Sequence, residues 1–300
     1  MNLKKILMPT DFSKPANHAL SQAVALALKY DAELIVLHAR VMYEDDPANL
    51  TAKIEALKDE ERKIEEDLLQ KLRNCTEHHK QLNVKHEIVR GYSSPSAILS
   101  YLNNNPFDLV VIGTHGRTGL GHFLIGSVTE KVVRYSPSPV LTIAPESTIT
   151  DQFKRILVPF DFSEHAKMAY QSALNIADNN QAQITLLYVL NRESHPEFYS
   201  WGMSDVFETI PDIEQKARAQ LEKVIQEIPN PDGVAIQTEV TEGVPHKGIK
   251  EYADEHELDL LIIATHGRVG LDRFLLGSTT EKVIRSVPLP ILTLKQQSIL

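Results

Sequence analysis

The chain carries one sequence pattern twice, and this internal repeat constrains the fold more strongly than any other feature. The segment Lys5–Ser13, which reads KILMPTDFS, returns as RILVPFDFS over Arg155–Ser163. The segment Gly113–Arg134 returns as Ala264–Arg285, and 15 of the 22 aligned positions are identical. The two offsets, 150 and 151 residues, far exceed the units of about 20 to 50 residues that build solenoids. The sequence therefore predicts two copies of one domain in tandem.

The length of the chain, 300 residues, fits two domains, because a typical domain holds about 100 to 200 residues. We predict domains at residues 1–147 and 152–297, with a short polar stretch between them. Each is large enough to bury a core without disulfides, and the single cysteine, Cys75, excludes an internal disulfide. The sequence shows no secretory signal and no run of about 20 apolar residues. We therefore expect a cytoplasmic protein without a membrane partner.

Acidic side chains outnumber basic ones, and the formal net charge is −9. This balance argues against a nucleic-acid partner, because binding to a phosphate backbone requires an extended basic surface. A small anionic ligand is compatible with it, since a local nest of backbone N–H groups is enough to bind one. None of the 12 histidines has the spacing of a closed tetrahedral zinc site. We therefore predict no metal site.

Short apolar runs typical of strands alternate with amphipathic patterns typical of helices in each half. In the first half we expect strands at 6–9, 34–38, 84–89, 108–112 and 140–143, and helices at 15–30, 51–80, 94–103 and 121–136. The second half repeats this order, with its last two strands at 260–263 and 291–294. Such alternation predicts an α/β fold in which helices sandwich a five-stranded parallel sheet. Ligands of such sheets bind at the carboxyl ends of the strands, where the strand order reverses.

A glycine-rich loop follows the fourth expected strand of each half. In the first half it begins with Gly113–Gly116, which reads GTHG, and after nine further residues it reaches Gly126 and Ser127. Glycines let backbone N–H groups approach phosphate oxygens, and the following helix N-terminus adds positive charge. Ser127 offers a hydroxyl and Arg117 a charged donor. A glycine pair after a strand is more often only a turn, and the chain contains neither of the common phosphate motifs, GxxxxGK[ST] and GxGxxG.

An aspartate follows the first expected strand of each half. Asp11 and Asp161 stand in the repeated segment Asp-Phe-Ser, at the edge of the sheet where ligands bind. A carboxylate there can accept a hydrogen bond from a sugar hydroxyl or a base amine. The same segment can equally serve to cap the helix that follows it. The residues alone favour neither function.

These motifs together resemble the universal stress protein family, in its ATP-binding type. The resemblance rests on Met8-Pro9-Thr10-Asp11 combined with Gly113-x-x-Gly116, nine residues and Gly126-Ser127, and it covers nearly the whole chain, twice. It implies two tandem domains of the adenine nucleotide alpha hydrolase-like, Rossmann-like fold. It also implies ATP, with or without Mg²⁺, as the ligand.

The resemblance further implies which residues form the site. Asp11, with Pro9 and Thr10 beside it, would contact the adenosine moiety, and Ala39, just after the second strand, would meet the adenine edge through its backbone. The ribose and phosphates would be wrapped by Gly113, His115, Gly116, Arg117, Gly126, Ser127 and Val128. The corresponding residues of the second half are Asp161, Val189, Gly267, Arg268, Gly277, Ser278 and Thr279.

The second half departs from the family pattern at two positions. Ala264 stands where the motif has its first glycine, which hinders a close approach of the backbone. Phe160 replaces the threonine before the aspartate and can crowd or stack on a base. If only one half binds ATP, we expect the first.

A cytosolic, nucleotide-dependent regulatory module of the stress response is the function that the resemblance implies. No nucleophile or general base is singled out by its spacing, so we predict no catalytic residue. A slow ATPase or phosphotransferase is one alternative, and an interaction protein whose second-half crevice binds another small molecule is a second. In the family the fifth strand mediates pairing. The resemblance therefore implies an intrachain pseudo-dimer through 140–143 and 291–294, and a homodimer of the whole chain.

Overall fold

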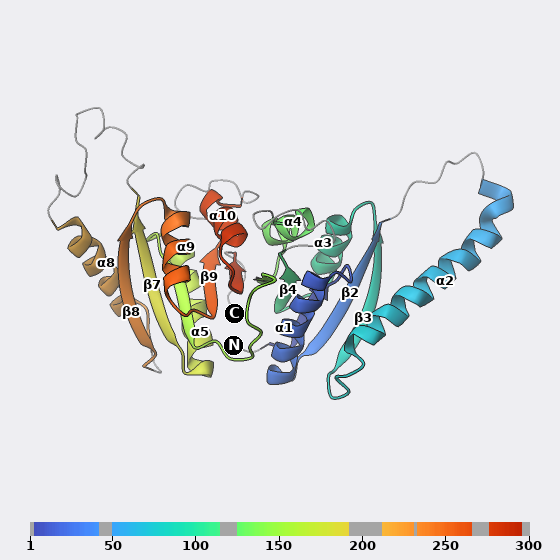
Figure 1. The fold of residues 1–300 in the computed structure, drawn as a ribbon, viewed down its shortest axis with the longest axis horizontal. Helices are drawn as coiled ribbons and strands as arrows, with labels where there is room; N and C mark the ends of the chain where they lie inside the picture. Colours follow the sequence, from blue (N-terminus) through green and yellow to red (C-terminus); the bar gives the residue numbers. More distant parts are fainter. Residues whose placement is uncertain are drawn as a thin grey trace, which may run out of the picture. The chain divides into compact units, whose positions relative to one another are not determined.

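The computed structural model describes residues 3–41, 50–114, 125–191, 212–230, 233–265 and 276–295, with the backbone alone for residues 50–60 and 179. The chain divides into two compact units. Residues 2–145 and 149–151 form one of them, and most of the other consists of residues 152–300. Each is an α/β domain built on a parallel sheet, as Figure 1 shows for the two halves of the chain.

The first domain has five parallel strands in the order β3-β2-β1-β4-β5. Its elements are β1 (Lys5–Pro9), α1 (Lys14–Tyr30), β2 (Glu33–Val41), α2 (Leu50–Thr76), β3 (Val84–Gly91), α3 (Ser94–Asn104), β4 (Leu109–Gly113), α4 (Ser127–Tyr135) and β5 (Val140–Ile143). The strand order reverses between β1 and β4, which is the point where ligands bind in such sheets.

The second domain repeats this arrangement in the order β10-β9-β6-β7-β8. Its elements are β6 (Arg155–Pro159), α5 (Glu164–Asn180), β7 (Gln183–Leu190), α8 (Ile213–Glu227), β8 (Ala235–Glu242), α9 (Pro245–Glu255), β9 (Leu260–Ala264), α10 (Ser278–Ser286) and β10 (Ile291–Leu294). The predicted fold class, two tandem domains with five-stranded parallel sheets sandwiched by helices, is confirmed.

The central strands of each sheet are covered by helices on both faces. In the first domain α1 packs on β1, β4 and β5, while α3 contacts β2, β3 and α4. Ile6, Leu7 and Met8 of β1 are therefore fully buried, as is usual for a parallel sheet. The helix α1 turns Ala19, Ala23 and other small residues toward the sheet. Among the residues that the structure describes, no helix is both long and apolar enough to cross a membrane.

Three predicted element boundaries are wrong by three residues or more, and one of them is the end of the helix expected at 51–80, which the structure places at Thr76. The helix expected at 121–136 starts only at Ser127, because the N–H group of Gly126 donates to the Thr114 oxygen at 2.8 Å and holds Gly126 extended at φ −62°, ψ 140°. The strand expected at 34–38 continues to Val41, because it pairs with β3 in parallel register up to Val41 and Gly91. Ala39 consequently lies within β2 and does not follow it.

Candidate functional site

The turn that carries Asp11 follows β1 at the carboxyl edge of the first sheet. Thr10 continues the ladder, since its N–H donates to the Leu37 oxygen at 2.8 Å. The hydroxyl oxygen of Thr10 accepts the N–H of Phe12 at 3.0 Å, and Oδ1 of Asp11 accepts the N–H of Ser13 at 3.0 Å. Two successive side chains thus fix the backbone of this turn.

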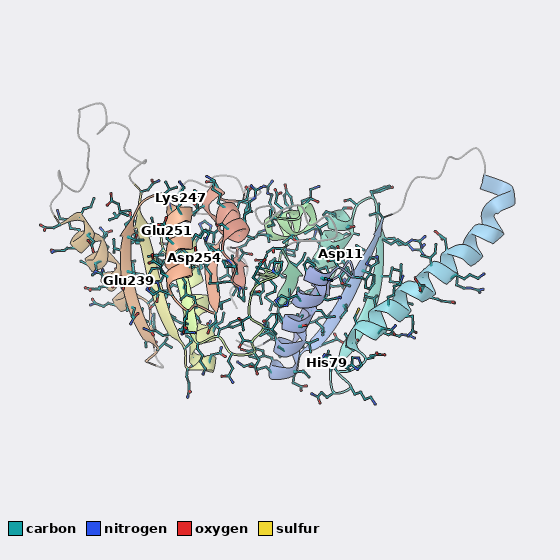
Figure 2. The ribbon with its side chains drawn as sticks, in the orientation of Figure 1. Asp11, His79, Glu239, Lys247, Glu251 and Asp254 are labelled. Carbon is teal, nitrogen blue, oxygen red and sulfur yellow. The ribbon has the colours of Figure 1, made fainter. Side chains whose placement is uncertain are left out.

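The N-cap of α1 is Ser13, whose Oγ accepts the N–H of Ala16 at 3.3 Å. Asp11 therefore belongs to the turn that precedes the cap. Its side chain is partly exposed, beyond the end of β1. Figure 2 labels Asp11 and also His79, which lies before β3 toward the opposite edge of the first sheet.

Phe12 has an unusual backbone conformation for a bulky residue. Its φ is 64°, in the left-handed region that L side chains rarely occupy. Its ring packs on the ring of His38 in β2, with centroids 4.8 Å apart and planes tilted by 33°. Nδ1 of His38 lies 2.8 Å from the carbonyl oxygen of Thr10. A strained backbone of this kind persists where surrounding contacts over-determine it, and it is often found at functional sites.

The end of β4 is tied to the start of α4 by two further hydrogen bonds. The Thr129 hydroxyl donates to the Gly113 oxygen at 2.6 Å, and the N–H of Gly126 donates to the oxygen of Thr114 at 2.8 Å. Gly126 is the N-cap of α4 and has no side chain that accepts from the first turn. The N–H groups at a helix N-terminus have no acceptors within the helix, so they can bind an anion.

The structure brings one set of the predicted site residues to a single edge of the first sheet. Because β1 pairs with both β2 and β4, the carboxyl ends of these three strands lie next to one another. This edge carries Pro9, Thr10, Asp11, Ala39, Gly113, Gly126, Ser127 and Val128. His115, Gly116, Arg117, Gly267 and Arg268 lie outside the described residues.

The second domain repeats the same backbone frame. Oδ1 of Asp161 accepts the N–H of Ser163 at 3.0 Å and its hydroxyl at 2.5 Å. The N–H of Gly277 donates to the Thr265 oxygen at 2.8 Å, and the Thr280 hydroxyl donates to the oxygen of Ala264 at 2.9 Å. The predicted residues Gly277, Ser278 and Thr279 thus stand at the N-terminus of α10, as their counterparts do at that of α4.

The side chains on this frame differ between the two domains. Phe160, which replaces Thr10, is buried, and its ring meets that of Phe162 edge to face at 5.5 Å. Phe162, with φ 62°, in turn packs edge to face on Tyr188 at 4.9 Å. Tyr188 occupies the position of His38. The second edge therefore carries an aromatic cluster where the first has a hydroxyl and an imidazole.

Val189 replaces Ala39, the predicted adenine contact. Its larger side chain fills space next to Gly248 of α9. A Cβ added to Gly248 of α9 would lie 3.0 Å from Cγ1 of Val189. The first domain has Ala97 at the position of Gly248, so the larger residue on the strand is matched by a smaller one on the helix. Neither this pair nor the pair His38 and Tyr188 was predicted from the sequence. Aligning the two halves position by position would have revealed both.

No group of three or more potential metal ligands occurs among the described side chains. Among the described residues, the first site presents backbone N–H groups, hydroxyls, the Asp11 carboxylate and the His38 imidazole. This set can bind a polar ligand with an anionic end.

Comparisons with known proteins agree for both halves. The Universal stress protein family matches residues 2–144 and 152–295. A universal stress protein of Methanocaldococcus jannaschii is 34% identical over 147 residues, which cover 48% of this chain and 83% of that protein. A universal stress protein E homolog of Haemophilus influenzae is 25% identical over 320 aligned residues and covers 98% of both chains.

A solved structure shares the tandem fold over the full length. The crystal structure of a universal stress protein from Archaeoglobus fulgidus has a TM-score of 0.63 and 20% sequence identity, and the match covers 99% of this chain and 100% of that one. At this identity the likeness concerns the fold alone. Since the family match covers nearly all of both halves, the chain belongs to the universal stress protein family.

Proposed function

We propose that the first domain binds an adenine nucleotide, ATP with or without Mg²⁺, and that the protein is a nucleotide-dependent regulatory module of the stress response. Asp11 receives the ribose or base of the nucleoside, and the backbone of Ala39 meets the adenine edge. The phosphates occupy the glycine loop and the N-terminus of α4, formed by Gly113, His115, Gly116, Arg117, Gly126, Ser127 and Val128.

The observation that carries this proposal is the placement of two unlike binding groups on one edge of the sheet. The Asp11 turn follows β1, and the glycine-capped start of α4 follows β4, which is the neighbour of β1. The strand order reverses between these two strands. A carboxylate suits the hydroxyls of a nucleoside, and a helix N-terminus suits phosphate oxygens.

The second domain is proposed not to bind the nucleotide in the same way, although Asp161, Val189, Gly267, Arg268, Gly277, Ser278 and Thr279 stand at the matching positions. Phe160 and Val189 are larger than Thr10 and Ala39, and both are buried. Ala264, also buried, adds a methyl group where the first domain has Gly113. These exchanges leave less room for a base and keep the phosphate farther from the backbone.

Calorimetry of the full-length protein with Mg-ATP tests both proposals. We expect about one nucleotide per chain. Asp11→Ala should weaken binding at least about tenfold, since a hydrogen bond to a charged group contributes about 1.5–3 kcal/mol. The matched control Asp161→Ala should leave the affinity unchanged. Gly116→Val should abolish binding while the circular dichroism spectrum stays that of the wild type.

The contradicting outcomes are distinct. Two nucleotides per chain, one of which is lost in Asp161→Ala, would assign a site to the second domain as well. Absence of binding, with no nucleotide retained in native mass spectrometry, would favour the interaction-protein alternative. Release of phosphate from ATP by the wild-type protein, and not by Gly116→Val, would favour the slow ATPase.

The pairing of the halves through residues 140–143 and 291–294, and a homodimer of the whole chain, stay predictions from the family resemblance. Sedimentation velocity of the full-length protein tests the homodimer through its molecular mass. A single species with the mass of one chain, 33.7 kDa, would contradict it.

A further inference from the structure

We infer that His38 is a positioning residue of the nucleotide site, which holds the turn that presents Asp11 to the nucleoside. This inference rests on the proposed function of the first domain. His38 stands one residue before Ala39 on β2, and it contacts the residues on both sides of Asp11.

The first contact is a hydrogen bond whose direction is fixed by chemistry. Nδ1 of His38 lies 2.8 Å from the carbonyl oxygen of Thr10. A carbonyl oxygen can only accept, so Nδ1 carries the proton and donates. The bond fixes the orientation of the peptide group that joins Thr10 to Asp11. It acts together with the Thr10 N–H, which donates to Leu37 at 2.8 Å, so both polar backbone groups of Thr10 are held by β2.

The second contact is made by the ring of Phe12, which follows Asp11. This ring packs on the imidazole at a centroid distance of 4.8 Å while its backbone stays at φ 64°. A bulky residue adopts this φ only under constraint. The imidazole thus holds Thr10 by a hydrogen bond and Phe12 by packing, so the backbone at Asp11, and with it the direction of its Cα–Cβ bond, is fixed from both sides.

The second domain has the ring contact but lacks the Nδ1 donor, so it shows what each of the two contacts does. Phe162 has nearly the same conformation, with φ 62°, and it packs on Tyr188 at 4.9 Å. An aromatic ring at this position is therefore enough to support the strained turn. Tyrosine has no ring nitrogen, so it cannot donate as Nδ1 of His38 does. The donor belongs to the first domain, the one proposed to bind the nucleotide.

The test compares the ATP affinity of the full-length variants His38→Phe and His38→Asn. Phenylalanine keeps a ring for Phe12 and removes the donor, whereas asparagine keeps a donor. We expect His38→Phe to weaken ATP binding about five- to tenfold, the factor for one net hydrogen bond. His38→Asn, which keeps the donor but loses the ring that packs on Phe12, should recover part of this loss. Tyr188→Phe, which also keeps the ring and removes its polar atom, is the matched control and should bind ATP as the wild type does.

A double-mutant cycle distinguishes positioning from direct contact. In an Asp11→Asn background His38→Phe should cause little further loss, because its effect passes through Asp11. Fully additive losses would overturn the inference, since they would mean that His38 acts independently of Asp11. Unchanged ATP affinity of a folded His38→Phe protein would overturn it too and leave the proposed function intact. If the wild-type protein binds no ATP, the proposed function fails and the positioning role with it.

Discussion

Tyr170 of α5 is fully buried, and its hydroxyl has no hydrogen-bond partner among the described residues. Burial raises the pKa of this hydroxyl to about 12, because the phenolate would lose its hydration. An unsatisfied buried polar group costs about 1–3 kcal/mol. We therefore expect Tyr170→Phe to increase the free energy of unfolding by about 1 kcal/mol, as measured by urea denaturation at pH 7. A decrease would mean that the hydroxyl is stabilising.

The raised pKa of Tyr170 also predicts how the free energy of unfolding depends on pH. Its pKa is about 12 in the folded protein and about 10 in the unfolded chain, so the unfolded chain releases the proton first. The part of the unfolding free energy that is linked to this proton is thus fully present below pH 10, and it is lost as the pH rises toward 12. The difference in unfolding free energy between Tyr170→Phe and the wild type should therefore widen over this range.

Some exchanges between the two halves were recognised from the sequence, and others were not. The exchanges at Phe160 and Ala264 were visible against a known motif, so they were recognised. The exchange of His38 for Tyr188 was not recognised. The exchanges of Ala39 for Val189 and of Ala97 for Gly248 were not recognised either. Their meaning depends on contacts between a strand and a helix or turn that lie far apart in the sequence.

At the scale of elements, alternating apolar and amphipathic patterns predicted the strands and most helices within a few residues. Two of the errors lie where distant backbone groups decide the boundary. No local pattern shows that Gly126 is bonded to Thr114, or that the pairing of β2 with β3 continues to Val41. The placement of Asp11 at the carboxyl edge of the first sheet followed from its position after β1. The Asx turn of Asp11 and the cap at Ser13 became visible only in the structure.

The start of α10 offers a test of these boundary contacts. A Cβ at Gly277 would lie 3.2 Å from the Thr265 oxygen, which accepts the Gly277 N–H and so cannot easily move away. Alanine is also a poor N-cap. We expect Gly277→Ala to lower the free energy of unfolding by about 1 kcal/mol in urea denaturation. The control Ser278→Ala changes an exposed residue of the same turn and should have a smaller effect. Equal losses in both would contradict the role of the close contact.

At the scale of the whole molecule, the connection between the two halves is itself bound to the first domain. Gln22 of α1 is fully buried, and its amide donates to the Thr150 oxygen at 2.6 Å and accepts the Thr150 N–H at 3.1 Å. Nζ of Lys29 donates to the oxygen of Asp151 at 2.6 Å. Residues 149–151 accordingly belong to the compact unit of the first half, although they follow its last strand by several residues.

Gln22 should therefore determine how firmly this connection is held. Gln22→Leu replaces the amide with an apolar side chain of similar size and removes both hydrogen bonds to Thr150. We expect the Thr150 amide to exchange with deuterium at least about fivefold faster, since its acceptor is lost. Lys29→Met removes the bond to Asp151 and leaves both hydrogen bonds between Gln22 and Thr150 in place, so exchange at Thr150 should stay nearly unchanged. If Gln22→Leu leaves that exchange unaltered, other contacts hold the connection. If exchange instead rises throughout α1 and β1, Gln22 stabilises the first domain as a whole and not the connection in particular.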